Sequence, residues 1–162
     1  MAGSKSTYLS KAILNHVLGF CTGPTLGTSF RFTPPATVYV GLWTQALTDA
    51  SDGSSTSTPG EVARTGGTSY ARASVANTAT NWPNATEPGD GTALKNNYNP
   101  ITFATAGANW GTITHFALLD TASTSDPQSG NILYWGQLSA SKPIGTNDTA
   151  SFAANALSIT EN

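Results

Sequence analysis

The sequence predicts a mainly β fold: a single-domain β-sandwich, or a jelly-roll-like variant of one, with one amphipathic helix near the N-terminus. A length of 162 residues suits one domain, and 38% hydrophobic residues suffice for a buried core. Short β-branched and aromatic runs alternate with turn residues, among them 16 Gly and 9 Pro. The 25 Thr and 17 Ser outnumber the charged residues, which make up only 10% of the chain. We therefore expect short strands joined by many polar, weakly charged turns.

Residues 6–18 are predicted to form the helix. Leu9, Ile13 and Val17 recur at every fourth position, which places them in one apolar stripe. Ser6 is suited to cap the N-terminus of this helix. Because an apolar stripe must be covered, we expect the helix to lie on a sheet or against a partner subunit.

The segment that follows, residues 19–35, is rich in Gly and Pro and is predicted to be a loop or arm. Its large apolar side chains need cover from the fold or from a neighbouring subunit. We accordingly divide the chain into a helix and arm over 1–33 and a β-sandwich over 34–162. The apolar side chains of the arm are Phe20, Leu26, Phe30 and Phe32.

Strands are predicted where β-branched and aromatic residues run together between turn signals. Stretches rich in Ser, Thr, Asn, Pro and Gly separate them and are predicted to be loops. This pattern is typical of a sandwich or jelly roll with about six to eight strands. The main predicted strands cover residues 37–43, 70–75, 101–105, 110–119, 131–138 and 157–160, and the long loops cover 48–60, 77–100 and 121–130.

Two of these strands carry apolar side chains on both faces. A sandwich strand open to water should bury only one face, so we expect the helix, the loops or another subunit to cover the second face. Strict alternation groups Ile132, Tyr134 and Leu138 against Leu133 and Trp135, and Ile113, Ala117 and Leu119 against Phe116 and Leu118.

No group of residues in the sequence indicates catalysis. His115 and Asp120 are five residues apart in one strand, so their side chains point to opposite faces and do not form a His–Asp pair. The acidic residues fall almost wholly in predicted loops, where they are solvated by default. Asp49 and Asp52 lack the alternating oxygen ligands of a calcium loop. We therefore expect no enzyme activity, no catalytic residue, no cofactor and no bound metal.

Charge and composition also argue against several classes of partner. The net charge is −2 and the 7 Lys and Arg are scattered, so there is no basic stripe for nucleic acid. No run of about eighteen apolar residues is present, and we expect no membrane span. The single cysteine, Cys21, has no partner for an internal disulfide, which suits assembly in a reducing cytosol.

A set of short strings spread from residue 6 to near residue 160 carries a family resemblance. The strings cover residues 6–10, 13–19, 34–43, 69–72, 81–83, 101–103, 110–116 and 133–136. Together they resemble a family of small virion structural proteins of tailed bacteriophages, labelled as tail-fibre or capsid-decoration proteins. The motifs are turns, strand cores and aromatic anchors, and the resemblance implies no catalytic residue.

The resemblance implies a virion protein that is assembled in the host cytoplasm. Our first expectation is a capsid cement or decoration protein that binds the major capsid protein and stabilises the head lattice. A homo-oligomer is expected, with a trimer favoured because it matches local three-fold positions of an icosahedral shell. The alternative is a tail-fibre or tail-tip component that contacts other tail proteins and the host surface. Coiled-coil heptads and fibrous repeats, which a long fibre usually has, are absent from the sequence.

In either location, buried apolar side chains would hold the subunit in place. The four Trp residues suit a core or a subunit interface better than a sugar-binding surface, although a contact with host glycan stays open. We predict that the main packing and interface anchors are Leu9, Ile13, Val17, Phe30, Phe32, Trp82 and Trp135.

Overall fold

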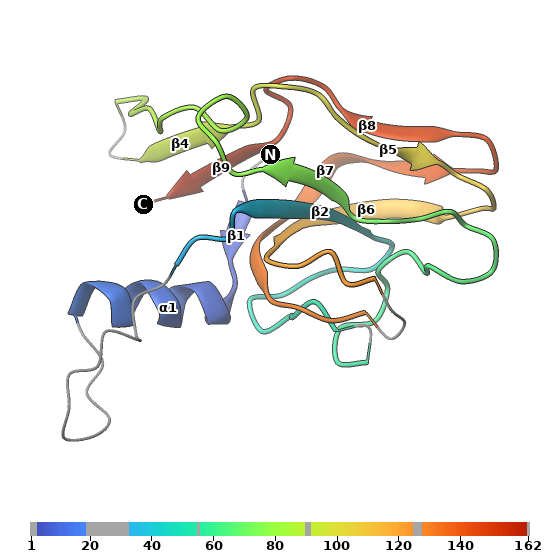
Figure 1. Cartoon of the computed structure of the whole chain (residues 1–162), viewed down its shortest axis with the longest axis horizontal. Coiled ribbons are helices and arrows are strands. Elements are labelled where there is room, and N and C mark those ends of the chain that lie inside the picture. The colour runs from blue at the N-terminus through green and yellow to red at the C-terminus, as the bar shows by residue number, and fades with distance from the viewer. Residues whose placement is uncertain (1–2, 19–32, 55, 90–91, 125–127, 162) are drawn as a thin grey trace.

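The computed structural model describes residues 3–18, 33–54, 56–89, 92–124 and 128–161. They form a mainly β fold with one helix near the N-terminus, which confirms the predicted fold class (Figure 1). The helix is α1 (Thr7–Leu18), and the strands are β1 (Gly3–Lys5), β2 (Thr37–Trp43), β3 (Ala73–Ala76), β4 (Ala93–Asn96), β5 (Ile101–Thr105), β6 (Gly111–Leu119), β7 (Ile132–Ile144), β8 (Thr149–Phe152) and β9 (Ser158–Glu161).

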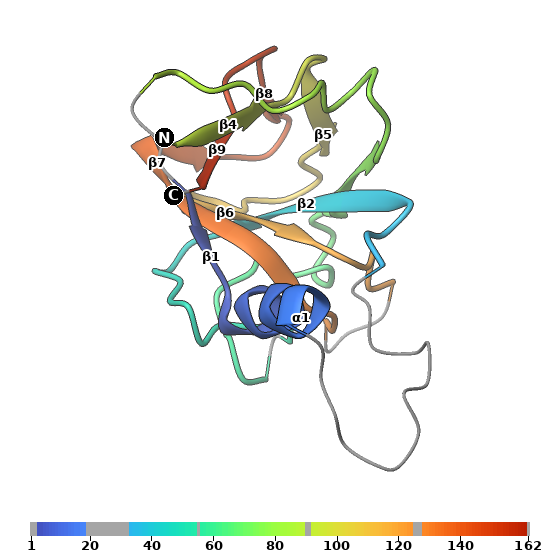
Figure 2. The ribbon, with the colours of Figure 1, turned by 90° about the vertical axis from the view of Figure 1, so that its left-hand side faces the viewer.

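The strands make one antiparallel sheet and two antiparallel ribbons. The sheet has the order β1-β7-β6-β2-β3, while β4 pairs with β9 and β5 pairs with β8. The two ribbons cover one face of the sheet, and α1 lies at one end on the opposite side (Figure 2). The result is a two-layer sandwich with a helix attached to one end.

The main core fills the space between the sheet and the ribbons. Val40 and Leu42 of β2 and Phe116 of β6 enter it from the sheet, and Phe103 and Phe152 enter it from the β5–β8 ribbon. The ring centroids of Phe116 and Phe152 lie 5.7 Å apart in an edge-to-face arrangement. Such aromatic pairs add to the stabilisation that apolar burial provides.

A smaller cluster covers the outer face of the sheet, away from the ribbons. Leu47, in the loop after β2, is buried there against the strands. The loops of the chain itself therefore cover much of the second apolar face that the sequence predicts. The buried members of this cluster are Trp43, Leu47, Ala117, Leu119 and Ile132, with Tyr39 and Trp135 packed against them.

A bulge in β7 changes which of its side chains share a face. The pairing with β6 skips Leu133, which is an extra residue in β7. Ile132 consequently lies in the outer cluster with Trp135. Strict alternation had grouped Ile132 with Tyr134, and that prediction was wrong because one extra residue reverses the faces of the strand.

A wider bulge lies farther along the same strand. β7 has residues 138–141 where β6 has only Thr114. This irregularity accompanies the placement of Ile113 in the main core with Phe116, whereas strict alternation had placed the two on opposite faces. Because β1 pairs only with residues 134–136, the wide bulge lies at the free edge of the sheet.

The predicted boundaries hold for the elements with strong local signals. α1, β2, β5, β6 and β9 agree with the predictions to within one residue at each end. Other elements differ: β4 lies inside the predicted loop 77–100, β7 continues six residues past 138 to Ile144, and β1 was not predicted. These strands are held by partners distant in sequence, such as β9 for β4 and β7 for β1.

Candidate functional site

An apolar groove opens where α1, the start of β2 and the β4–β9 ribbon meet. Its volume is about 290 Å³. Apolar side chains make most of its walls, and polar groups such as Lys95 and Glu161 lie among them. The apolar groove is defined here by Leu9, Ile13, Trp82, Leu94, Leu133 and Ile159.

Ser6 fixes the helical wall of the groove to the sheet. Its Oγ accepts a hydrogen bond from the backbone N–H of Leu9 at 3.1 Å, which confirms the predicted N-cap. The same hydroxyl donates to the carbonyl of Ile132, and the Ser6 N–H donates to the carbonyl of Leu133 at 3.1 Å. Ser6 is fully buried. The first turn of α1 is thus anchored to β7, and Leu9 is held in the groove.

Trp82 forms part of the opposite wall. Its backbone N–H donates to the carbonyl of Thr78 at 2.8 Å, which fixes the turn that carries the indole. The side chain is buried, and its Nε1 has no hydrogen-bond partner among the described residues. A buried indole without a partner for its N–H carries a desolvation cost, so apolar packing must hold Trp82 here.

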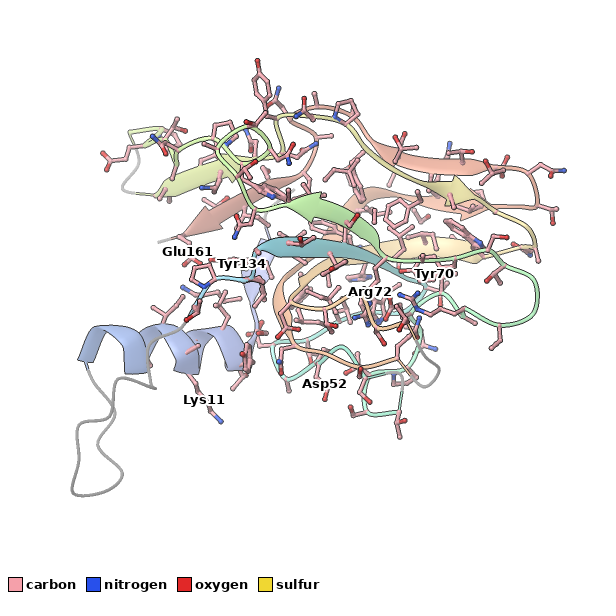
Figure 3. The ribbon with its side chains drawn as sticks, viewed as in Figure 1. Lys11, Asp52, Tyr70, Arg72, Tyr134 and Glu161 are labelled. Atoms are coloured by element: carbon pink, nitrogen blue, oxygen red, sulfur yellow. The ribbon has the colours of Figure 1, made fainter. Side chains whose placement is uncertain are left out.

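Glu161 connects β9 to the sheet beside the groove. Tyr134 of β7 donates its hydroxyl to Glu161 Oε1 at 2.6 Å, and Lys5 of β1 forms an ion pair with Oε2. Burial raises the pKa of Tyr134, and the hydrogen bond to the Glu161 carboxylate raises it further. Figure 3 shows Tyr134 and Glu161 close together above the helix. Tyr134, Lys5 and Glu161 bond to one another beside the groove, and the groove walls themselves are mostly apolar.

The outward face of α1 is also partly apolar. Tyr8 and Leu14 are 43% and 57% exposed. Lys11, the single charged residue of the helix, points away from the sheet (Figure 3). The helix therefore presents apolar side chains on two sides, with Leu9 and Ile13 toward the groove and Tyr8 and Leu14 toward solvent.

The structure brings together three of the seven predicted anchors. Leu9 and Trp82 are buried in the groove, and Ile13 lines it half-buried. The side chain of Val17 and all of Phe30 and Phe32 lie outside the described residues. The role of these anchors in binding a neighbour stays a prediction.

Trp135, the remaining predicted anchor, lies elsewhere. It is half-buried on the outer face of the sheet, and its Nε1 donates to Asp49 Oδ1 at 3.2 Å. Its ring centroid lies 6.2 Å from that of His115. Trp135 therefore fixes the loop after β2 to the sheet and does not contribute to the groove.

A buried polar network at the loop end of the sandwich was not predicted from the sequence. Arg72 donates to Glu61 from Nε at 2.8 Å and from Nη2 at 2.6 Å. Tyr70 donates its hydroxyl to Glu61 Oε1 at 3.0 Å. Burial, and then the charge of Glu61, raise the pKa of Tyr70 well above its usual value.

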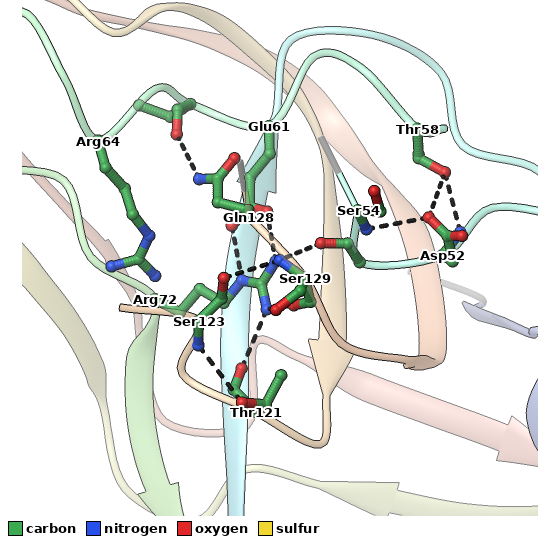
Figure 4. Close-up of polar contacts among 12 residues, drawn as sticks. Asp52, Ser54, Thr58, Glu61, Arg64, Arg72, Thr121, Ser123, Gln128 and Ser129 are labelled. Atoms are coloured by element: carbon green, nitrogen blue, oxygen red, sulfur yellow. Dashed lines mark hydrogen bonds and ion pairs between the residues drawn. The ribbon is translucent and has the colours of Figure 1, made fainter. Parts of the chain in front are cut away.

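The remaining Arg72 donors bind the loops on either side (Figure 4). Nη1 donates to the carbonyls of Thr121 and Ser129, at 3.0 and 2.8 Å, and Nη2 donates to the carbonyl of Gly53 at 2.9 Å. All five N–H groups of a guanidinium are thereby used within the chain. The network holds the loops after β2 and β6 together and leaves no donor for an outside ligand.

The one sequence signal for this network is the alternation of Tyr70 and Arg72. Two side chains spaced by two residues share a face of an extended segment, so a buried Tyr70 implies a buried Arg72. A buried guanidinium needs a carboxylate, but Glu61 and the loop carbonyls are not identifiable without the fold.

His115 and Asp120, the two residues considered for a catalytic pair, each make a hydrogen bond to another residue. His115 Nδ1 lies 2.9 Å from Thr114 Oγ1, and burial lowers the pKa of His115. Asp120 accepts hydrogen bonds from Asn131 instead, at 2.9 Å from the backbone N–H and 2.7 Å from Nδ2. The histidine and the carboxylate thus have separate hydrogen-bond partners.

The described residues lack two further kinds of feature. They contain no group of three His, Cys, Asp or Glu side chains that could hold a metal ion. They also contain no helix that is long and apolar enough to cross a membrane. Asp52 uses its carboxylate within its own loop, where Ser57 and Thr58 donate to it at 2.7 and 3.2 Å.

Comparison with known proteins gives one result over nearly the whole chain. A family model described as "Podophage GP4 fiber I protein gp80" matches residues 4–160. No curated protein matches the chain. The matched segment includes the helix, the groove and all but the outermost residues of the sandwich. The chain therefore belongs to the podophage GP4 fiber I family of phage virion structural proteins.

Proposed function

We propose that this chain is a structural subunit of a phage tail fibre. The observation that carries the proposal is the match of residues 4–160 to a family described as a fiber protein. Our first expectation, a capsid cement protein, is less well supported because the family description names a fibre and not a capsid component. The tail-fibre alternative is therefore the function that we adopt.

The subunit acts by packing and not by chemistry. The apolar groove and the outward face of α1 offer surfaces for neighbouring proteins. Within the described residues, His115 and Asp120 are committed to structural contacts, and Arg72 is fully bonded inside the chain. We propose no enzyme activity, other fibre or tail proteins as partners, and no binding of nucleic acid or membrane.

The location is tested by imaging whole particles. Antibodies against this chain, labelled with gold, are applied to intact phage and viewed by electron microscopy. We expect label at the tail end. Label spread over the heads would reject the fibre function and support capsid decoration. Antibody pre-absorbed with purified chain serves as the control for non-specific label.

A genetic test separates the two functions by their consequences. A phage with an amber codon in this gene is grown in a non-suppressing host, and the particles are purified. For a fibre subunit, we expect DNA-filled heads that resist heat like wild-type heads but bind poorly to host cells. Loss of head stability with normal adsorption would contradict the proposal.

A further inference from the structure

We propose that a polar cavity between β3 and β5, together with the neighbouring Tyr98, binds uncharged sugar units of a host-surface saccharide. The inference rests on the proposed function, because a tail fibre meets the surface of the host cell. The cavity has a volume of about 270 Å³ and lies where the last strand of the sheet faces the β5–β8 ribbon. The residues of its wall that could bind a sugar hydroxyl include Ser74, Asn81, Asn99 and Thr102.

The wall of this polar cavity has no charge. Each of the described residues that line it is uncharged, and hydroxyl and amide groups lie among small apolar side chains. An ionic ligand would lose its hydration here without gaining a compensating charge. A purely apolar ligand would leave the polar groups of the wall without partners. The wall therefore suits a ligand with many uncharged hydroxyl groups, which donate and accept hydrogen bonds.

The free edge of β3 adds backbone donors and acceptors to the cavity. The N–H of Asn77 donates to the carbonyl of Ala36 at 2.9 Å, and this bond sets the phase of the β2–β3 ladder. Because bonded and non-bonded pairs alternate in an antiparallel ladder, the N–H and C=O of Ser74 point away from β2. These two groups lie on the edge that borders the cavity.

Two asparagine side chains in the wall are held in fixed orientations. Asn81 donates from Nδ2 to the carbonyl of Ala76 and accepts at Oδ1 from Asn99 Nδ2, both at 3.0 Å. Asn99 Nδ2 also donates to the carbonyl of Thr80 at 3.3 Å. These bonds use the donor end of the Asn99 amide and do not use its Oδ1. An amide that is already oriented loses little conformational freedom when it binds a ligand.

Tyr98 provides an exposed aromatic ring on a rigid loop beside the cavity. Its N–H donates to the carbonyl of Asn81 at 2.8 Å, and Asn99 follows it in the chain. The preceding Asn97 is buried, and its Nδ2 donates to the carbonyls of Asn99 and Ala153 at 2.9 and 2.8 Å. The backbone is thus fixed on both sides of Tyr98, whereas Tyr98 itself is 59% exposed. The negatively polarised face of such a ring attracts the C–H groups on the face of a sugar.

The test titrates the full chain with two polysaccharides of the host, one from its lipopolysaccharide and one from its capsule, by isothermal titration calorimetry. Tyr98→Ala removes the ring, and Thr102→Val replaces a hydroxyl by a methyl group at an exposed position of β5. We expect binding to one of the polysaccharides, which identifies the source of the saccharide. Affinity should fall about tenfold for Tyr98→Ala and about three- to tenfold for Thr102→Val.

Tyr8→Ala is the matched control, because it removes an exposed tyrosine from α1, outside the cavity, and should bind like the wild type. Thermal unfolding of each variant separates weaker binding from misfolding. Binding to neither polysaccharide overturns the inference, and so does binding that either cavity variant leaves unchanged. A photo-cross-linking residue at position 74 that joins another subunit in intact particles would also overturn it, since a partner strand would then occupy the edge.

The two proposals can fail separately. If gold label lies on the tail and neither polysaccharide binds, the inference fails while the fibre function stands. If the label lies on the heads and both variants weaken saccharide binding, the fibre function fails while the binding site stands.

Discussion

Arg72 and Glu61 form a two-point ion pair in which both carboxylate oxygens are used, and their side chains are 0% and 1% exposed. A charge pair removed from water in this way is costly to break, because the partner left behind keeps its charge without compensation. The pair lies beneath the loops that follow β2 and β6, so its loss should also loosen those loops.

Arg72→Met should therefore lower the free energy of unfolding by about 3–5 kcal/mol. The cause is the buried carboxylate of Glu61, together with three loop carbonyls that lose their donors. Urea unfolding followed by tryptophan fluorescence measures the change. The double variant Glu61→Leu with Arg72→Met should be less unstable than the sum of the single variants, since no charge remains unpaired. Strict additivity would contradict this account.

Ser6→Ala should destabilise the chain by about 1–2 kcal/mol. The substitution removes the N-cap of α1 and leaves the carbonyl of Ile132 without the donor that it now has. Thermal unfolding monitored by circular dichroism measures the effect. Ser10→Ala is the matched control within the same helix, and alanine there should be neutral or slightly stabilising because of its higher helix propensity.

Gly107→Ala should be poorly tolerated for a steric reason. A Cβ at this position would lie 2.3 Å from the carbonyl oxygen of Gly67, and that oxygen belongs to backbone that cannot simply rotate away. We expect a loss of about 1–3 kcal/mol, the range for overpacked sites. Gly145→Ala, where the nearest atom is 3.5 Å away, should have little effect in the same denaturant titration.

His115 should make stability depend on pH in the acidic range. Burial lowers its pKa in the folded chain, so the unfolded chain binds more protons between the folded pKa and the usual value near 6.5. Stability should then fall as the pH drops through this window and rise as the pH increases. The free energy of unfolding at a series of pH values measures the slope. His115→Gln should flatten this slope. An unchanged slope would mean that other titratable groups cause the pH dependence.

Substitutions at Trp82 and Leu14 should have different effects, the first on folding stability and the second on association. Trp82 is 6% exposed, and Trp82→Ala should cost about 3–5 kcal/mol of stability in the isolated chain. Leu14 is 57% exposed, and Leu14→Glu should leave the melting temperature nearly unchanged while it weakens association. Calorimetry alongside sedimentation measures both. A large fall in melting temperature for Leu14→Glu would show that this side chain belongs to the core.

Local sequence signals predicted the helices and strands whose residues strongly favour that type of secondary structure. β2 has the alternating β-branched and aromatic run expected of a strand, and α1 has its cap and its stripe. β4 was missed because Ala93–Asn96 has little strand propensity and forms by pairing with β9. The bulges of β7 were missed because alternation assumes an unbroken ladder.

For the candidate site too, some residues could be predicted from local sequence signals, but their arrangement could not. The helical periodicity named Leu9 and Ile13, and aromatic character named Trp82, but nothing in the sequence indicated that the three meet in one groove. Leu94 and Glu161 complete the groove through strand pairing between positions far apart in the chain. Such juxtapositions depend on topology, which local propensity does not encode.

The wide bulge in β7 bears on how the subunit behaves before it is built into a particle. Residues 138–141, Lys142 and Pro143 occupy the free edge of the sheet, where an unprotected strand would recruit strands from other molecules. An irregular backbone, a cation and a residue without an N–H each discourage that recruitment. At high concentration of the chain, this edge is therefore a poor template for open-ended β-stacking.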